Sequence, residues 1–180
     1  QRVVDVVTRV ADSLVNDADT LTELDSEIGD ADFGVNLERG LEAVVEELED
    51  GEFDGPDEVL NVAGRTLISE MAGSSGILFG KSLMEASDAL ADGVDLDGVV
   101  EFAERYRDNV AEQGDVDIGA KTMFDAIQPT VYALKRGQAL EETGIVEVSA
   151  QATKACEYGA TFTIPLRAKK GRASYTEWRS

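Results

Sequence analysis

The sequence contains no histidine and a single cysteine, Cys156, among its 180 residues. Without histidine there is no imidazole to act as a general base or a metal ligand. Carboxylates, hydroxyls, lysine, arginine and backbone N–H groups are left as chemical tools. A single cysteine also excludes an internal disulfide, which makes a cytoplasmic protein the simplest expectation.

Positive charge is scarce as well, since 16 Lys and Arg stand against 37 Asp and Glu, for a formal charge of -21. Such a surface repels phosphate backbones and anionic lipids, so we expect no nucleic acid and no membrane surface as a partner. The acids are scattered among apolar-periodic segments, which argues against disorder. An acidic binding surface and adaptation to high salt both remain open. If the protein is adapted to high salt, its fold should depend on salt, because dissolved ions screen the repulsion among its carboxylates.

Long apolar runs are missing too. No stretch of about 18 apolar residues occurs, and the N-terminus has no basic head followed by an apolar core, so neither a membrane span nor a signal peptide is expected. The length and the 43% content of hydrophobic residues fit one compact domain over residues 1–180.

What is present is helical periodicity. Apolar residues recur at helical spacing within segments 3–14, 37–48, 60–71, 77–90, 99–110 and 123–134, and segment 145–168 also favours helix. Pro129 is expected to kink the sixth segment. The glycines and the proline expected to end helices are Gly51, Gly55, Pro56, Gly93, Gly98, Gly114, Gly119, Gly137 and Gly144. Without strand alternation or hairpin turns, the pattern predicts an all-α antiparallel assembly with short loops.

An aspartate-rich loop runs from Leu24 to Asn36 and contains Asp25, Asp30 and Asp32 within eight residues. Glycines let its backbone fold back. Hard divalent cations prefer carboxylate oxygens, and Mg²⁺ is usually held by a few of them together with nucleotide phosphates. An acidic helix cap with an Asx-turn explains the same residues without a metal, and the spacing is not that of an EF-hand.

Three further segments suggest phosphate binding, although each has a plainer explanation. Gly73-Ser74-Ser75-Gly76 precedes a helix, where free N–H groups and hydroxyls suit a phosphate, or where small residues simply allow close packing. Gly114 to Met123 is a glycine loop before a helix, or an ordinary connection. Lys169 to Tyr175 is a cationic island, either a phosphate clamp or a helix C-terminus ended by Gly171.

Taken together and in order, these segments resemble the nucleotide-binding L subunit of dihydroxyacetone kinases. The resemblance rests on Leu-Asp-Ser-Glu-Ile-Gly-Asp-Ala-Asp-Phe-Gly-Val-Asn from Leu24, Gly-Ser-Ser-Gly from Gly73, Ala-Lys-Thr-Met-Phe-Asp-Ala from Ala120 and Lys-Gly-Arg-Ala-Ser-Tyr from Lys170. It covers nearly the whole chain. It implies an up-and-down barrel of eight helices with the nucleotide at one rim. The family pattern continues past Tyr175 into a last helix, so the resemblance implies either that this part is missing from the sequence or that the barrel is open.

The resemblance also implies roles for individual residues. Asp25, Asp30 and Asp32 would hold two Mg²⁺ ions that bridge the phosphates of ADP or ATP. The residues expected to contact the nucleotide are Gly34, Val35, Asn36, Ser74, Ser75, Gly114, Met123 and Arg172. Gly114 and Met123 would border the base and sugar, and Arg172 would face the phosphates. The chain departs from the family pattern at Phe33, where relatives usually have His, and at Ala120, where they usually have Asp.

In this family a separate K subunit holds dihydroxyacetone through a histidine, so a chain without histidine resembles the phosphoryl-donor half alone. Some relatives exchange ATP, whereas others retain ADP that a phosphotransferase-system protein rephosphorylates, and the residues leave both modes open. Two other functions are weighed beside this one. They are a related kinase for another acceptor, such as the fatty-acid-type kinases, and a non-enzymatic nucleotide sensor.

Overall fold

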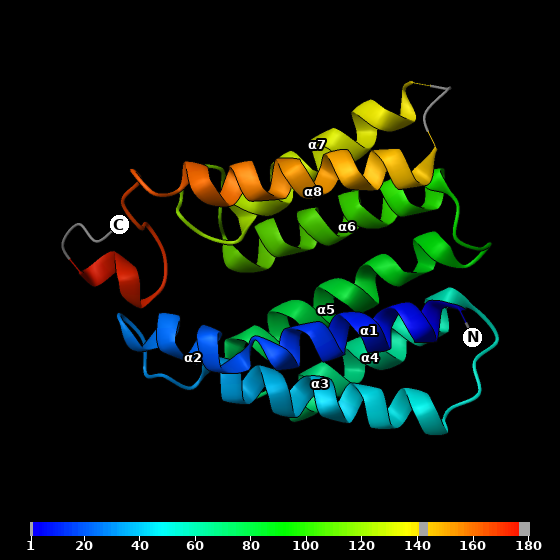
Figure 1. The fold of residues 1–180 in the computed structure, drawn as a ribbon, viewed down its shortest axis with the longest axis horizontal. Coiled ribbons are helices and arrows are strands. Elements are labelled where there is room, and N and C mark those ends of the chain that lie inside the picture. Colours follow the sequence, from blue (N-terminus) through cyan, green and yellow to red (C-terminus); the bar gives the residue numbers. More distant parts are fainter. Residues whose placement is uncertain (1, 141–143, 177–180) are drawn as a thin grey trace. The chain divides into compact units, whose positions relative to one another are not determined.

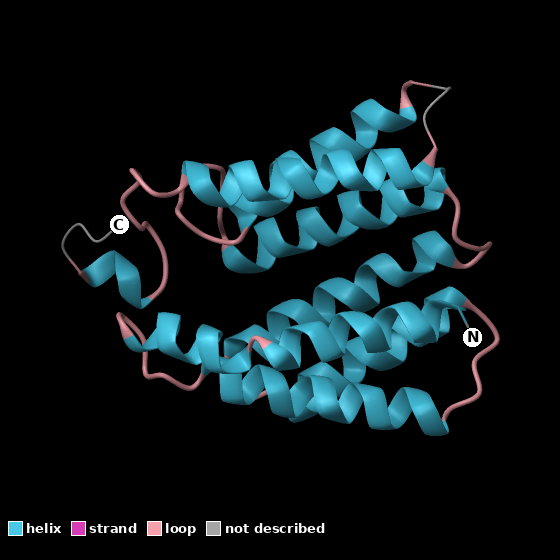
Figure 2. Cartoon of the chain, viewed as in Figure 1, coloured by secondary structure: helices cyan, strands magenta, loops and turns pink. Residues whose placement is uncertain are grey.

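A computed structural model describes residues 2–140 and 144–176, and across those residues the chain forms helices and no strand (Figures 1 and 2). The α-helices are α1 (Arg2–Asn16), α2 (Ala18–Ser26), α3 (Phe33–Asp50), α4 (Pro56–Glu70), α5 (Ser74–Ser87), α6 (Leu96–Gly114), α7 (Phe124–Gln138) and α8 (Ile145–Phe162). Two short 3₁₀ helices are η1 (Asp88–Leu90) and η2 (Arg172–Tyr175). The all-α prediction is confirmed.

The helices pack as two compact units, residues 1–92 and residues 93–180. That residues 1–180 act as one nucleotide-binding domain stays a prediction.

In the first unit, α3 packs against α1, α2 and α4, and α4 packs against α5. Helix α4 runs antiparallel to both α3 and α5 (Figure 1). The apolar stripes expected from helical periodicity face one another there. The buried cluster that they form consists of Ala11, Leu37, Leu41, Val44, Leu48, Val59, Ala63, Leu67 and Met71. Phe33 packs against this cluster from the first turn of α3.

A glycine pair sets the contact between α4 and α5. A Cβ atom built on Gly64 would lie 2.5 Å from the carbonyl oxygen of Gly80, and one built on Gly80 would lie 2.3 Å from that of Gly64. Neither position has room for a side chain, because backbone atoms cannot move aside as the end of a flexible side chain can. The two backbones therefore touch directly at this crossing.

In the second unit, α7 packs against both α6 and α8. A small cluster of Val100, Leu134, Val148 and Ala152 is buried among the three helices. Gly159 brings α8 close to the first turns of α7, since a Cβ there would lie 2.2 Å from the carbonyl oxygen of Asp125 and 2.7 Å from the ring of Pro129. Pro129 lies inside α7, and having no N–H it cannot donate to the Asp125 carbonyl four residues earlier.

Several sequence expectations about helix ends are wrong. Gly98 and Gly137 lie inside helices rather than ending them. Gly98 donates its N–H to the Asp95 carboxylate at the start of α6 (2.8 Å), and Gly137 is glycine because a Cβ would lie 2.6 Å from the side chain of Val148. The helix predicted up to residue 168 ends at Phe162, where turns take over.

One helix was not expected at all, namely α2. Its nine residues carry few apolar side chains, so they gave no clear helical stripe. None of the described helices is both long and apolar enough to cross a membrane.

Candidate functional site

The reversal between α2 and α3 depends on Asp25. The carbonyl oxygen of Asp25 accepts N–H bonds from Ile28 (3.1 Å) and Gly29 (2.5 Å), which close the last turn of α2. The side chain of Asp25 folds over the same turn, because a Cβ on Gly29 would lie only 1.9 Å from its Oδ1. Ala31 then takes a positive φ of 60°, and the chain turns into α3. Glycine at position 29 thus leaves room for the Asp25 carboxylate.

The Asp25 carboxylate also holds the start of α3. Its Oδ2 accepts the N–H of Asp32 (3.1 Å) and that of Phe33 (3.4 Å). Asp32 occupies the N-cap position of α3, but its own side chain makes no capping hydrogen bond. The capping interpretation of this loop therefore describes Asp25 in part and does not describe the Asp32 side chain.

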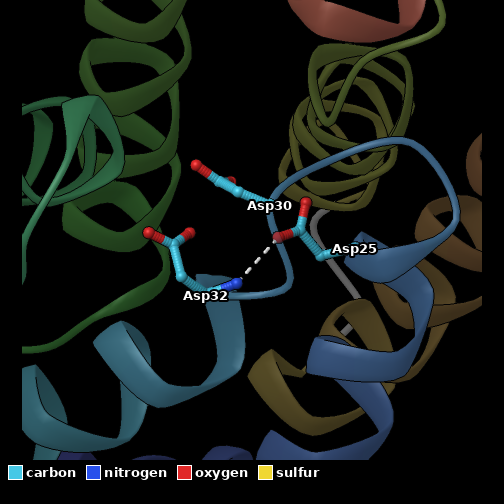
Figure 3. Close-up of side chains that lie close together, drawn as sticks. All are labelled: Asp25, Asp30 and Asp32. Carbon is cyan, nitrogen blue, oxygen red and sulfur yellow. Dashed lines mark hydrogen bonds between the residues drawn. The ribbon is translucent and has the colours of Figure 1, made fainter.

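Three carboxylates converge at this turn. One oxygen from each of Asp25, Asp30 and Asp32 lies within 4.8 Å of the others, with Asp25 half-buried and the other two exposed. Figure 3 shows these side chains extending from the loop and from the helix ends on either side of it, with the Asp32 N–H pointing back to Asp25. Three negative charges this close repel one another, so a cation is the natural counter-charge. Carboxylate oxygens at this spacing fit a hard divalent ion such as Mg²⁺.

The next three predicted contact residues form the first turn of α3. Gly34 is buried against α2, where a Cβ would lie 2.0 Å from the carbonyl oxygen of Ala18. Val35 is exposed, and the N–H of Asn36 donates to the carbonyl of Asp32 (3.0 Å). The structure therefore places Gly34, Val35 and Asn36 directly beside the acidic cluster along the chain, with Gly34 serving helix packing.

Ser74 and Ser75 are the first two residues of α5, as the sequence predicted. Gly73 precedes them with a φ of 83°, a left-handed conformation that suits glycine. As the N-cap residue, Gly73 has no side chain with which to cap the first N–H groups of this helix. Ser74 is exposed and Ser75 is half-buried. Free N–H groups at a helix start, with hydroxyls beside them, suit an anion.

In the second unit, Gly114 is the last residue of α6 and Met123 is the N-cap residue of α7. Between them, Asp115 adopts a left-handed conformation that ends α6, and Gly119 and Lys121 have positive φ values of 82° and 58°. The predicted glycine loop before a helix is confirmed as a structural feature. Its contact with a nucleotide stays a prediction.

Sequence reasoning missed Asp125, which organises this loop. Its side chain is 1% exposed, and its two carboxylate oxygens accept the N–H groups of Gly119 (2.5 Å) and Thr122 (3.0 Å). A buried carboxylate is costly unless it is hydrogen-bonded, and these two donors come from one tight loop. Asp125 stands in the Ala120–Ala126 motif, but no local pattern there indicates that its side chain is buried.

The cationic segment lies against the same loop. The N–H of Lys169 donates to the carbonyl of Ala120 (3.0 Å), and the Nζ of Lys121 donates to the carbonyl of Ile164 (3.3 Å). Lys170 forms an ion pair with Asp115 (2.6 Å). The hydrogen bond from Lys170, together with its charge, lowers the pKa of the Asp115 carboxyl below its ordinary value.

Arg172 begins η2, directly after Gly171, whose φ is 65°. The expectation that Gly171 ends a helix is wrong, because α8 has already ended at Phe162. Arg172 is exposed, and it lies three residues after Lys169, whose N–H is bonded to the Ala120 carbonyl.

The predicted site residues are divided between the two units. The aspartates, Gly34 to Asn36 and both serines lie in the first unit. Gly114, Met123 and Arg172 lie in the second.

Comparison with known proteins gives the family. The DAK2 domain family matches residues 27–180. The chain is 36% identical over 182 residues to the ADP-binding subunit DhaL of the PEP-dependent dihydroxyacetone kinase of Escherichia coli, covering 99% of this chain and 86% of that protein. It is 33% identical over 161 residues to the ADP-binding subunit DhaL of PEP-dependent dihydroxyacetone kinase 1 of Listeria innocua, covering 89% and 75%.

The fold matches the dihydroxyacetone kinase of C. freundii in its native form, with a TM-score of 0.73 and 24% identity over 93% of this chain and 30% of that one. A second structure of that kinase, in complex with AMP-PNP and Mg²⁺, matches with a TM-score of 0.71. This chain spans less than a third of the solved protein. From the motifs, the helical fold and these relatives, we conclude that the chain belongs to the DAK2 family and, within it, to the DhaL subunits of dihydroxyacetone kinases, a family of phosphotransferases.

Proposed function

We propose that this protein is the phosphoryl-donor subunit of a dihydroxyacetone kinase, which binds a magnesium–adenine nucleotide and passes phosphate to dihydroxyacetone held by a separate K subunit. The observation that carries the proposal is the convergence of Asp25, Asp30 and Asp32, whose carboxylate oxygens lie within 4.8 Å of one another. The relatives support it, since those named above are ADP-binding subunits of such kinases.

In this proposal, Asp25, Asp30 and Asp32 hold two Mg²⁺ ions. Magnesium bound there supplies charge neutralisation for the nucleotide phosphates, which is the main need of phosphoryl transfer. Asp25 contributes twice, because the carboxylate that ligates the metal also fixes the start of α3 through the N–H of Asp32. The proximity of three acids predicts that nucleotide binds weakly without the cation.

The remaining contacts fall at helix ends, where backbone N–H groups are available. Ser74 and Ser75 offer hydroxyls at the start of α5, and Asn36 lies in the first turn of α3. We assign phosphate contacts to these residues and to Arg172, whose guanidinium is a planar fork of donors. Gly34 and Val35 line the same end of α3. We assign Gly114 and Met123 to the base and sugar.

A partner subunit is required in this proposal because the chain has no histidine with which to hold the acceptor. The names of the relatives from Escherichia coli and Listeria innocua also favour one donor mode, in which the kinase depends on phosphoenolpyruvate and the subunit binds ADP. A relative from Lactococcus lactis, 30% identical over 160 residues, is named as part of a phosphotransferase-system-dependent kinase. We therefore favour ADP retained as a cofactor and rephosphorylated by a phosphotransferase-system protein.

Calorimetric titration of the purified protein with ADP, with and without Mg²⁺, tests nucleotide binding. Asp30→Ala should weaken MgADP binding at least about tenfold, since even residues that only support metal ligands cost this much. Asp12→Ala, which removes an exposed acid from α1, is the matched control and should bind like the parent. Unchanged affinity in Asp30→Ala would contradict the metal assignment.

Phosphoryl transfer needs a second assay. The protein is mixed with a K subunit and dihydroxyacetone, and then with either ATP or phosphoenolpyruvate and the phosphotransferase-system proteins. We expect transfer in the phosphoenolpyruvate arm and none from the chain without the K subunit. Nucleotide binding without transfer in either arm would instead favour the sensor function, which the replacement of the usual His by Phe33 would then explain. Transfer to another acceptor would favour the related kinase.

A further inference from the structure

We infer that Asp125 is a positioning residue for nucleotide binding, acting through the loop between α6 and α7 without touching the nucleotide. The inference rests on the proposed function, because the loop carries Met123 and braces the segment that leads to Arg172. It adds a residue that neither the sequence motifs nor the relatives assign.

The first step is the burial of a charged group in a loop with strained backbone. Asp125 is 1% exposed, and both of its oxygens are used by N–H groups of the loop, from Gly119 and Thr122. Gly119 and Lys121 have positive φ values, a conformation that costs free energy for Lys121 and is held here by surrounding bonds. The Asp125 carboxylate supplies two of those bonds, one before and one after Lys121.

The second step leads from the loop to the cationic segment. Ala120 stands between Gly119 and Thr122, so fixing their N–H groups also fixes the direction of the Ala120 carbonyl. That carbonyl accepts the N–H of Lys169 (3.0 Å). Arg172 follows three residues later. The carboxylate of Asp125 therefore determines where the segment before Arg172 is attached.

The Asp125 carboxylate is held in place by the helices around it. Asp125 lies in the first turn of α7, where an acidic residue interacts favourably with the helix dipole. Helix α8 covers this turn at Gly159, whose absent side chain lets it approach the Asp125 backbone. With the side chain 1% exposed and both oxygens bonded to loop N–H groups, the carboxylate is enclosed and presents its acceptors to the loop.

Asp125→Asn is the sharpest test. Asparagine is nearly isosteric with aspartate, but it has only one side-chain oxygen. It can therefore accept one of the two N–H groups, and its NH₂ group then faces the other N–H, where donor meets donor. Asp117→Asn is the matched control, because it makes the same charge change in the same loop at an exposed residue, whose carboxylate accepts the N–H of its neighbour Ile118. We expect the MgADP dissociation constant of Asp125→Asn to rise at least about tenfold, as for other residues that support direct contacts. The control should bind like the parent.

Hydrogen exchange of backbone amides separates positioning from general loss of stability. In Asp125→Asn, the amides of Thr122 and Lys169 should exchange faster than in the parent, while that of Val110, buried in α6, should keep its rate. Affinity is measured well below the unfolding midpoint of each variant. Faster exchange across the whole chain, or unchanged affinity in a folded Asp125→Asn protein, would overturn the inference.

A second variant decides the matter if Asp125→Asn does not fold. Gly119→Ala places a side chain where the nearest described atom beyond the chain neighbours is the Lys169 Nζ at 3.9 Å, so we expect its effect to come from the positive φ of 82°. It should weaken MgADP binding in a folded protein, and parent-like affinity would overturn the inference. Absence of MgADP binding by the parent protein would refute the proposed function, whereas a binding parent with unaffected variants would refute the role of Asp125 alone.

Discussion

The Oδ2 atom of Asp25 lies 3.1 Å from the backbone nitrogen of Asp32, so one member of the acidic cluster is hydrogen-bonded to the backbone of another. The same oxygen accepts the N–H of Phe33. The Asp25 side chain therefore contributes negative charge to the acidic cluster and also holds the first backbone N–H groups of α3. Substitutions at position 25 can separate these two contributions.

Asp25→Ala should lose both contributions, and Asp25→Asn only the charge. Asparagine retains an oxygen that can accept the Asp32 N–H, whereas alanine removes the acceptor that caps the start of α3, at about 0.5–2 kcal/mol. We expect both variants to lose MgADP affinity, and Asp25→Ala to unfold at a lower temperature than Asp25→Asn. Calorimetric titration and thermal circular dichroism measure the two effects. Parent-like affinity in Asp25→Asn would argue against a metal at this cluster.

Arg172→Lys should already weaken MgADP binding, and Arg172→Ala should weaken it further. A guanidinium can bond phosphate oxygens in a bidentate manner, which an ammonium cannot reproduce. The helix-end explanation no longer applies, because α8 ends at Phe162 and Arg172 lies ten positions later. Arg167→Lys, at an exposed arginine that precedes the cationic segment, serves as the control in the titrations. If both Arg172 variants bind like the parent, its phosphate role is wrong.

Gly64→Ala should destabilise the first unit by about 1–3 kcal/mol, since the added methyl group would lie 2.5 Å from the Gly80 carbonyl oxygen. For a chain of this size, this corresponds to roughly 2–4 °C of unfolding midpoint per kcal/mol. Gly55→Ala is the control, because its Cβ would meet only the end of the flexible Asp57 side chain. A calorimetric scan in which both variants melt with the parent would show that α4 and α5 are not in close backbone contact.

Molar KCl should raise the unfolding midpoint, because the formal charge is -21 and screening reduces repulsion among carboxylates. The last residues of α3 show where the repulsion lies. Glu46, Glu47, Glu49 and Asp50 are all exposed at a helix C-terminus, where the dipole disfavours negative charge. Replacing the three glutamates by glutamine should raise the midpoint in dilute buffer and reduce its salt dependence. A midpoint that does not change with KCl would leave only the acidic-surface interpretation.

Periodicity was sufficient for the long helices and failed where packing, rather than local preference, sets the residue. Gly137 looks like a stop, but it is glycine because Val148 occupies the space beside it. That contact joins two different helices, so no local pattern reports it. Helix α2 was missed for the converse reason, since its partner α3 supplies the contacts that its own sequence does not indicate.

The residues of the candidate site also differ in how well the sequence predicts them. The three aspartates are close in sequence, so their convergence could be predicted from one glycine-containing loop. Asp125 could not be found by this reasoning, because in the sequence it is one of 37 acids and only the fold distinguishes it by burial. Its donors, Gly119 and Thr122, precede it by a few residues in a loop whose conformation the sequence does not specify.

The extent of the first apolar cluster along the chain has a consequence for biosynthesis. Among the described residues, its buried members and the side chains packed on them lie between Val3 and Leu83. A ribosome that has released the first 92 residues has therefore already delivered these members of the cluster. Since domains tend to fold as units during translation, α1 to α5 are able to shield their apolar surfaces from aggregation while the rest of the chain is still being made.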